Sequence, residues 1–112
     1  MRLELPPEAR AELRRAAVWF DERRPGLGEF IAEVSAAFDR IGNAPESYPA
    51  WPATRARNPL IRKTTLQRFP YAIAFEKHER HLLVLAVAHA KRRPLYWLTR
   101  EALNEIWVVT RG

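Results

Sequence analysis

The sequence predicts an α+β domain in which a hairpin of two helices packs on one face of an antiparallel sheet. Two stretches in the first half carry apolar residues at helical spacing, and only a short Pro/Gly connector separates them. Three short stretches in the second half have strand patterns and are joined by short links, as in an antiparallel meander. The third of them, Leu82–Ala88, has no polar residue, which indicates a strand covered on both faces.

The length of 112 residues allows one domain with one core, and an apolar fraction of 47% is ordinary for a folded protein. The chain has no cysteine, which rules out disulfides and thiolate metal sites and favours a reducing compartment. The first residues lack the apolar segment of a secretion signal, and no apolar run approaches the length of a membrane span. We therefore expect a soluble, cytoplasmic protein.

The first half begins with a short strand and continues with the two helices. Residues 1–5 alternate apolar and charged side chains, which predicts a strand at a sheet edge. Pro6 and Pro7 end it and suit the start of a helix from about Pro7 to Arg24. This helix has an alanine-rich apolar stripe made of Ala9, Leu13, Ala16, Ala17 and Phe20. Trp19 falls off the stripe, either at the end of the core or as an exposed anchor for a partner.

A second helix is expected after the connector 25–28 and ends at about Ile41, before Gly42 and Asn43. Its predicted stripe is Leu27, Phe30, Ile31, Val34, Phe38 and Ile41. The contact between the hairpin and the sheet is assigned to Leu13, Phe20, Phe30, Val34 and Phe38.

The remainder of the chain is read as a loop, three strands and a tail. Four prolines make 44–59 an ordered loop, and strands are predicted over 60–69, 71–77 and 82–88. Residues 1–100 form the predicted domain. Residues 101–112 are predicted to be an extension of this domain. Their pattern suits either a helix or a strand, and they either belong to the natural protein or were added to it.

The charge is distributed unevenly. The net charge is +6, but residues 1–54 carry seven Arg and nine Asp or Glu, a net of −2, whereas residues 55–112 carry twelve Lys or Arg and four Glu, a net of +8. The basic half suits a nucleic acid or an acidic protein segment. We expect its cations to converge on the sheet face that the helices leave uncovered, beside two aromatics. The predicted binding residues are Arg62, Lys63, His89, Lys91, Arg92, Trp97, Arg100 and Trp19.

Several kinds of chemistry have no matching motif. The four glycines form no phosphate-binding loop, and no Ser/His/Asp set stands out. His78 and His81 lie on a polar turn without a third ligand, so no metal site and no cofactor are predicted. The cationic face with Tyr96 and Trp97 suits phosphates and stacked bases. A nuclease would use Arg68 and Arg93 to stabilise charge, and Tyr96 or His89 to move a proton.

Four stretches occur in an order and spacing that resemble the RelE/ParE superfamily of bacterial type II toxins, and within it the ParE-like, plasmid-stabilisation branch. They are PPEARAEL, AAVWFDERRPGLGEFIAEV, IRKTTLQRFPYAIAFE and VLAVAHAKRRPLYW, and RFPYAI and RRPLYW are the most specific pieces. The resemblance covers residues 2–100. It implies a RelE/ParE-like β-α-α-β-β-β toxin that a cognate antitoxin keeps inactive in a hetero-oligomer.

The resemblance leaves the activity open between three hypotheses. ParE-like members inhibit DNA gyrase by binding, without chemistry of their own. RelE-like members cleave mRNA on the ribosome, and by position Arg62 or Lys63, Arg68, Arg93 and Tyr96 fall where such nucleases keep functional groups. The third hypothesis is an inactive member retained for antitoxin pairing. We place the gyrase inhibitor first, so the chain is expected not to be an enzyme.

Overall fold

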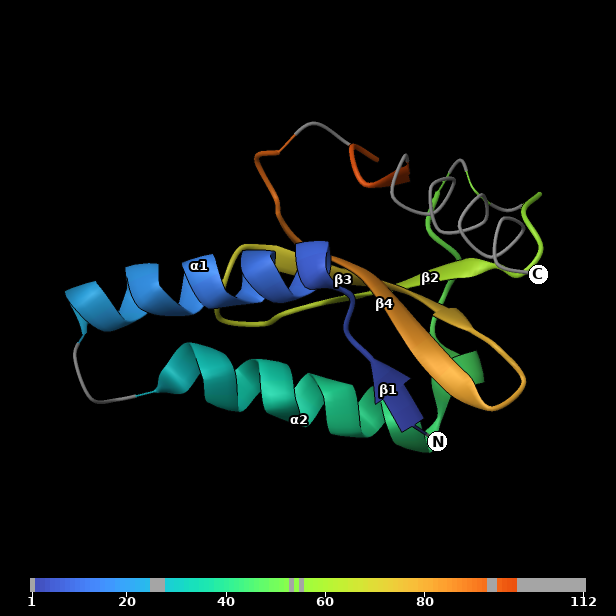
Figure 1. The fold of residues 1–112 in the computed structure, drawn as a ribbon, viewed down its shortest axis with the longest axis horizontal. Helices are drawn as coiled ribbons and strands as arrows, with labels where there is room; N and C mark the ends of the chain where they lie inside the picture. Colours follow the sequence, from blue (N-terminus) through green and yellow to red (C-terminus); the bar gives the residue numbers. More distant parts are fainter. Residues whose placement is uncertain (1, 25–27, 53, 55, 93–94, 99–112) are drawn as a thin grey trace.

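A computed structural model of the protein describes residues 2–24, 28–52, 54, 56–92 and 95–98. Figure 1 shows two helices running side by side against a sheet. The elements in chain order are β1 (Arg2–Glu4), α1 (Pro7–Arg23), α2 (Glu29–Asn43), a single 3₁₀ turn η1 (Pro45–Ser47), β2 (Ile61–Thr65), β3 (Tyr71–Lys77) and β4 (His81–His89). This order confirms the predicted α+β fold. The extension 101–112 lies outside the described residues.

The four strands form one sheet in the order β1-β4-β3-β2. The pairs β2–β3 and β3–β4 are antiparallel, as the meander pattern predicts. β1 is at an edge, also as predicted, but it runs parallel to β4, with Leu3 opposite Leu82. The sheet is therefore antiparallel except for this one pair. The helical hairpin carries the chain from β1 at one edge of the sheet to β2 at the other edge.

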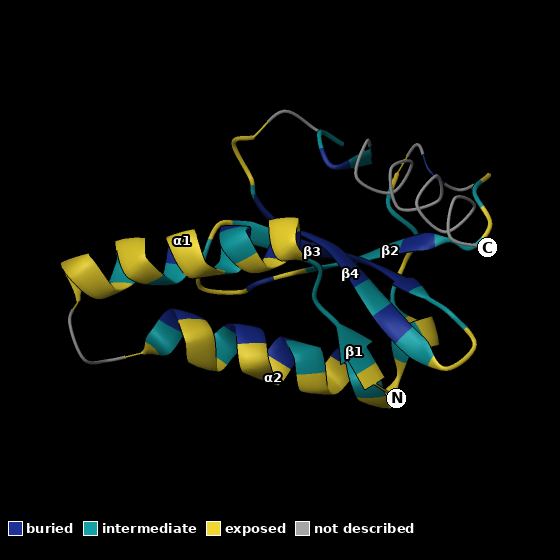
Figure 2. Ribbon diagram, viewed as in Figure 1, coloured by how far each residue is buried: buried dark blue, intermediate teal, exposed yellow. Residues whose placement is uncertain are grey.

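The main core lies between the helices and the sheet. Ala9 and Ala16 bring α1 close to the strands, because they have no side chain beyond Cβ to keep the backbones apart. The buried members of this cluster are Ala9, Ala16, Phe30, Val34, Ala37, Ile41, Leu66, Ile73, Phe75, Leu82, Val84 and Val87. Leu13, Phe20 and Phe38 pack against it while partly buried. Figure 2 shows the alternation of buried and exposed residues around both helices.

The opposite face of the sheet is covered as well. Trp97 is completely buried there, and its ring meets Trp51 edge-on with 5.0 Å between ring centroids. The buried members of this second cluster are Ile61, Ala74, Leu85, Ala86, Ala88 and Trp97. The prediction that the helices leave this face uncovered is therefore wrong for the part over which residues 95–98 fold back.

The proline-rich segment before β2 runs along the outer edge of that strand. Trp51 donates its backbone N–H to Ile61 (2.7 Å), and Lys63 donates to Pro49 (3.1 Å). Tyr48 then packs against the helix-side core and Trp51 against the second cluster. The predicted loop is confirmed for its described residues, and it gives β2 backbone partners along its outer edge.

Two predicted details differ from the structure. Ile31 was placed on the buried stripe of the second helix, but it is 46% exposed, and Ala37 is buried instead. β2 ends at Thr65 rather than at residue 69, because Leu66–Pro70 turns the chain into β3. Within the described residues, no helix is both long enough and apolar enough to span a bilayer.

Candidate functional site

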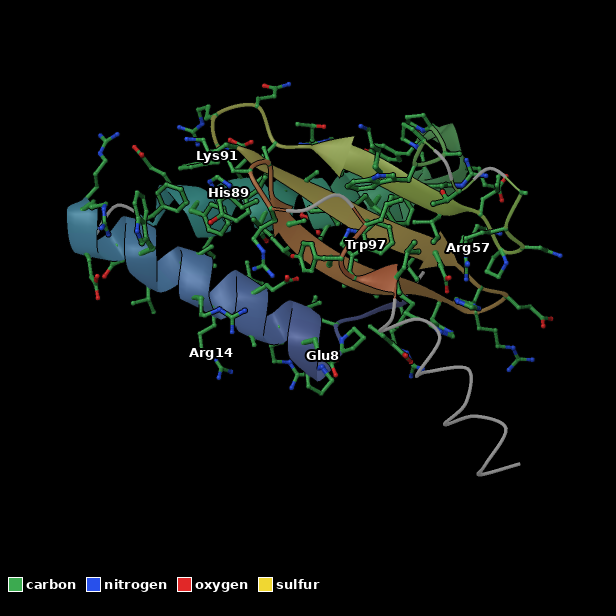
Figure 3. The ribbon with its side chains drawn as sticks, turned by 90° about the horizontal axis from the view of Figure 1, so that it is seen from above. Glu8, Arg14, Arg57, His89, Lys91 and Trp97 are labelled. Carbon is green, nitrogen blue, oxygen red and sulfur yellow. The ribbon has the colours of Figure 1, made fainter. Side chains whose placement is uncertain are left out.

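The end of β4 and the residues that follow it bring together the polar and aromatic groups that the sequence singled out. His89 accepts a hydrogen bond at Nδ1 from the Lys91 backbone N–H (3.0 Å), so its neutral ring carries its proton on Nε2. Ala90 donates to the Pro70 carbonyl (2.7 Å), and Arg92 donates its backbone N–H to the His89 carbonyl (3.0 Å). These bonds fix a turn, 89–92, which we call the β4 exit. Figure 3 shows His89 and Lys91 together at one end of the sheet.

A cavity of about 550 Å³ lies on the helix side of the β4 exit, and we call it the helix-side cavity. Its lining is Glu12, Arg15, Ala16, Trp19, Phe20, Pro70, Tyr71, Val87, His89, Arg92 and Tyr96. Aromatic rings and cations thus share this space with one carboxylate. That mixture suits recognition of a protein side chain better than it suits binding of a polyanion, because the carboxylate repels phosphate.

Glu12 is the central polar group of this cavity, and it is only 6% exposed. Its Oε1 accepts the backbone N–H of Val87 (3.1 Å), and its Oε2 accepts the hydroxyl of Tyr96. β1 pairs only with His81–Leu83, so among the described strands none lies beside β4 at Val87 on that side. Glu12 supplies the missing acceptor and also holds the segment 95–98 against the sheet.

Tyr71 lies beside Glu12 in the same cavity. Burial raises the pKa of its phenol, and the negative charge of Glu12 raises it further, because both disfavour the phenolate. The ring also meets His89 edge-on, with 5.0 Å between centroids. Tyr71 therefore stays neutral at physiological pH and can donate a hydrogen bond, but it is poorly suited to act as a base.

A smaller cavity of about 260 Å³ lies on the other face of the sheet, and we call it the sheet-side cavity. Its lining is Trp51, Lys63, Thr65, Pro70, Tyr71, Ala72, Ala88, His89, Ala90, Arg92, Leu95, Tyr96 and Trp97. The ammonium of Lys63 lies 5.2 Å from the Trp51 ring centroid, and the guanidinium of Arg92 lies 4.1 Å from that of Tyr96. These lining residues include cations and a histidine but no Asp or Glu.

The other predicted binding residues are dispersed. Arg62 donates to the Tyr48 carbonyl (2.7 Å) and so supports the loop. Arg68 pairs with Glu33 of α2, with 3.1 Å between Nε and Oε1. Trp97 is a core residue and cannot contact a ligand without leaving its place. The predictions that Arg62 and Arg68 converge on the uncovered face, and that Trp97 binds there, are therefore wrong. Arg93 and Arg100 lie outside the described residues.

Trp19 is 49% exposed, which fits an exposed anchor rather than the end of the core. The guanidinium of Arg23 lies 3.5 Å from its ring centroid. Val18 and Ile31 are also exposed and line a third cavity of about 690 Å³, between the two helices and the β2–β3 turn. We call it the hairpin cavity. Arg68 lines this cavity, whereas Tyr96 lines the helix-side cavity. The prediction that the two residues share one site is therefore wrong.

The contact between Glu33 and the β2–β3 turn predicts a pH dependence of stability. Partial burial opposes ionisation, but hydrogen bonds from the Gln67 backbone N–H (2.6 Å) and from Arg68 outweigh it and hold the pKa of Glu33 below its ordinary 4.5. This stabilisation is complete above pH 4.5 and is lost as the pH falls through the lower folded-state pKa. We expect Glu33→Gln to lower the urea midpoint at neutral pH and to reduce its fall on acidification. Identical acid profiles for both proteins would contradict this.

Pattern reading missed Glu12, although a signal was present. Glu12 follows Ala9 by three residues and precedes Ala16 by four, so it lies on the buried face of α1. A charged residue at such a position needs partners. His78 and His81 stack with 4.9 Å between centroids, but among the described residues no three acidic or histidine side chains gather as a metal site would require.

Comparisons with known proteins show the fold. No family model and no curated protein matches the sequence. A solved chain from the "Chromosomal ParDE TA system from P. aeruginosa" is similar in structure, with a TM-score of 0.54 and 17% sequence identity. The match covers 81% of this chain and 97% of that one. It confirms the RelE/ParE-like fold that the sequence resemblance implies.

Proposed function

We propose that the chain is the toxin of a bacterial type II toxin–antitoxin system and inhibits DNA gyrase by binding it in the cytoplasm. The fold and the likeness to a chain of a ParDE system support the first part. One observation favours binding over catalysis. Two of the residues a nuclease would use are engaged elsewhere, since Arg68 pairs with Glu33 and Tyr96 donates its hydroxyl to Glu12.

This engagement is unfavourable for phosphoryl chemistry. A transition state that gains negative charge needs donors aimed at it from one side. Arg68 and Tyr96 line different cavities, and each has a carboxylate partner. Arg68 and Tyr96 therefore do not share the cluster that the ribosome-dependent nuclease requires. That nuclease remains the alternative, and its remaining candidates are Lys63, His89 and Arg93.

The recognition surface proposed for gyrase is the exposed apolar patch on the helical hairpin, Val18, Trp19 and Ile31. Exposed tryptophan is costly to keep in water and is enriched among residues that dominate interfaces. Arg23 over the ring adds a charged group beside the apolar one. A binding toxin needs such a surface, whereas a nuclease depends chiefly on its reacting groups.

The test compares supercoiling with translation. Purified protein is expected to inhibit supercoiling by gyrase and to leave mRNA uncut on ribosomes. Trp19→Ala should weaken the inhibition about tenfold, as expected for a central interface residue, with an unchanged circular dichroism spectrum. Arg40→Gln, at an exposed position on α2, is the control and should inhibit like the wild type. Cleavage in the ribosomal A site, abolished by Arg93→Ala, would establish the nuclease instead.

A further inference from the structure

We infer that the sheet-side cavity binds a carboxylate side chain from the antitoxin segment that covers this toxin. The inference rests on the proposed function for the identity of the partner. It rests on the cavity itself for the chemistry of the contact. Lys63 enters the cavity from β2, and His89 and Arg92 enter it from the β4 exit.

The lining of this cavity is positively charged. Lys63 and Arg92 supply two cations, and no Asp or Glu is among the described residues that line it. The helix-side cavity shares His89, Arg92 and Tyr96 but contains the carboxylate of Glu12. Of these two cavities, only the sheet-side cavity combines cations with no carboxylate among its described lining residues. Charge complementarity of this kind sets both the partner and the rate at which it is found.

The hydrogen-bonding groups fit a carboxylate. His89 accepts at Nδ1 from the Lys91 backbone N–H, so Nε2–H is the donor of its neutral ring, and the residue lines the cavity. Arg92 is exposed and offers the planar set of donors that carboxylates accept in pairs. The bonds of the β4 exit hold both residues in place, since Ala90 and Arg92 are tied to the Pro70 and His89 carbonyls. A preorganised site loses less entropy on binding.

The aromatic rings argue for a protein partner rather than RNA. Single-stranded RNA is held by bases stacked on open ring faces. Here Lys63 lies over Trp51, Arg92 lies over Tyr96, and Trp97 is completely buried. A base that stacks on a ring face covered by one of these cations has to displace it. A carboxylate can instead bind the N–H groups of the cations where they are. At about 260 Å³ the cavity also suits one side chain.

The probe is a short, fluorescein-labelled glutamate-rich peptide, followed by fluorescence anisotropy against the full-length chain. We expect the peptide to bind with an affinity that falls as salt rises. Lys63→Gln and Arg92→Gln should each weaken binding about fivefold, since partly exposed ion pairs contribute modestly. Arg14→Gln removes the same charge from α1, outside the cavity and on the other side of that helix from His89 and Lys91 in Figure 3, and should not change the affinity.

A single-stranded RNA of equal charge serves as the competing probe. Tighter binding of RNA than of peptide, lost in the same two variants, would overturn the inference in favour of a nucleic-acid site. Equal losses in all three variants would also overturn it, because only net charge would then be recognised. The supercoiling assay is read separately. If the protein inhibits gyrase but does not bind the peptide, only this inference is overturned. If it binds the peptide but does not inhibit gyrase, only the proposed target is overturned.

Discussion

Replacing Phe75 with alanine is expected to lower the free energy of unfolding by about 3–5 kcal/mol, as for other fully buried aromatics. Phe75 is 0% exposed at the centre of β3, opposite Val84 of β4, and its ring meets Tyr48 edge-on at 5.8 Å between centroids. Small domains are stable by only about 5–15 kcal/mol, so this change should remove a large part of the total. Urea unfolding followed by circular dichroism measures it.

Phe38→Ala is the matched control for this prediction. The apolar spacing of the second helix groups Phe38 with the core residues, but in the structure it is only partly buried. Its replacement should therefore cost clearly less than that of Phe75, because less apolar surface returns to water. If both variants lost the same free energy of unfolding, the burial of the two rings would not determine their contributions to stability.

Glu12→Ala should cost about 2–4 kcal/mol, because one buried and one partly buried donor lose their acceptor at once. These donors are the Val87 backbone N–H and the Tyr96 hydroxyl. Tyr96→Phe removes one of the bonds and leaves the carboxylate its bond to Val87, so we expect a loss of about 1 kcal/mol. Glu22→Ala, an exposed carboxylate on the same helix, should change stability by less than about 0.5 kcal/mol.

A double variant, Glu12→Ala with Tyr96→Phe, tests whether the two residues act as a pair. Residues in direct contact are expected to be non-additive. The double variant should therefore lose less stability than the two single variants together, since Tyr96 has already lost its acceptor when Glu12 is absent. Strict additivity would contradict the bond between them.

The helices and strands could be predicted from the sequence because local residue patterns determine where they form. β3 was predicted at residues 71–77 and lies at Tyr71–Lys77, since the alternation of Tyr71, Ile73 and Phe75 faces the helices throughout. α1 was predicted to within one residue because Pro7 starts it and its apolar stripe is regular. The parallel pairing of β1 with β4 has no local signal, because it depends on where the helical hairpin returns the chain.

The candidate site was predicted only in part. His89, Arg92 and Tyr96 were expected to lie near one another after β4, and all three line the sheet-side cavity. Their role in binding stays a prediction. The convergence of Arg68 failed because strand alternation was extended beyond Thr65, where β2 ends. The sequence pattern alone could not show whether Trp97 is buried or exposed. Its burial depends on Leu95, whose positive φ of 60° directs the next residues back over the sheet.

The parallel strand pair has a consequence for how the chain folds as it is synthesised. β1 is made first, but its partner is β4, with Arg2 opposite His81. The same strand supplies much of the surface on which α1 packs, including Leu82, Val84 and Val87. The part of the α1 stripe that packs on β4 therefore remains uncovered until β4 leaves the ribosome, although Phe20 can already stack on Phe30 of α2. Such late, non-local contacts slow folding and prolong the time in which a nascent chain can aggregate or be degraded.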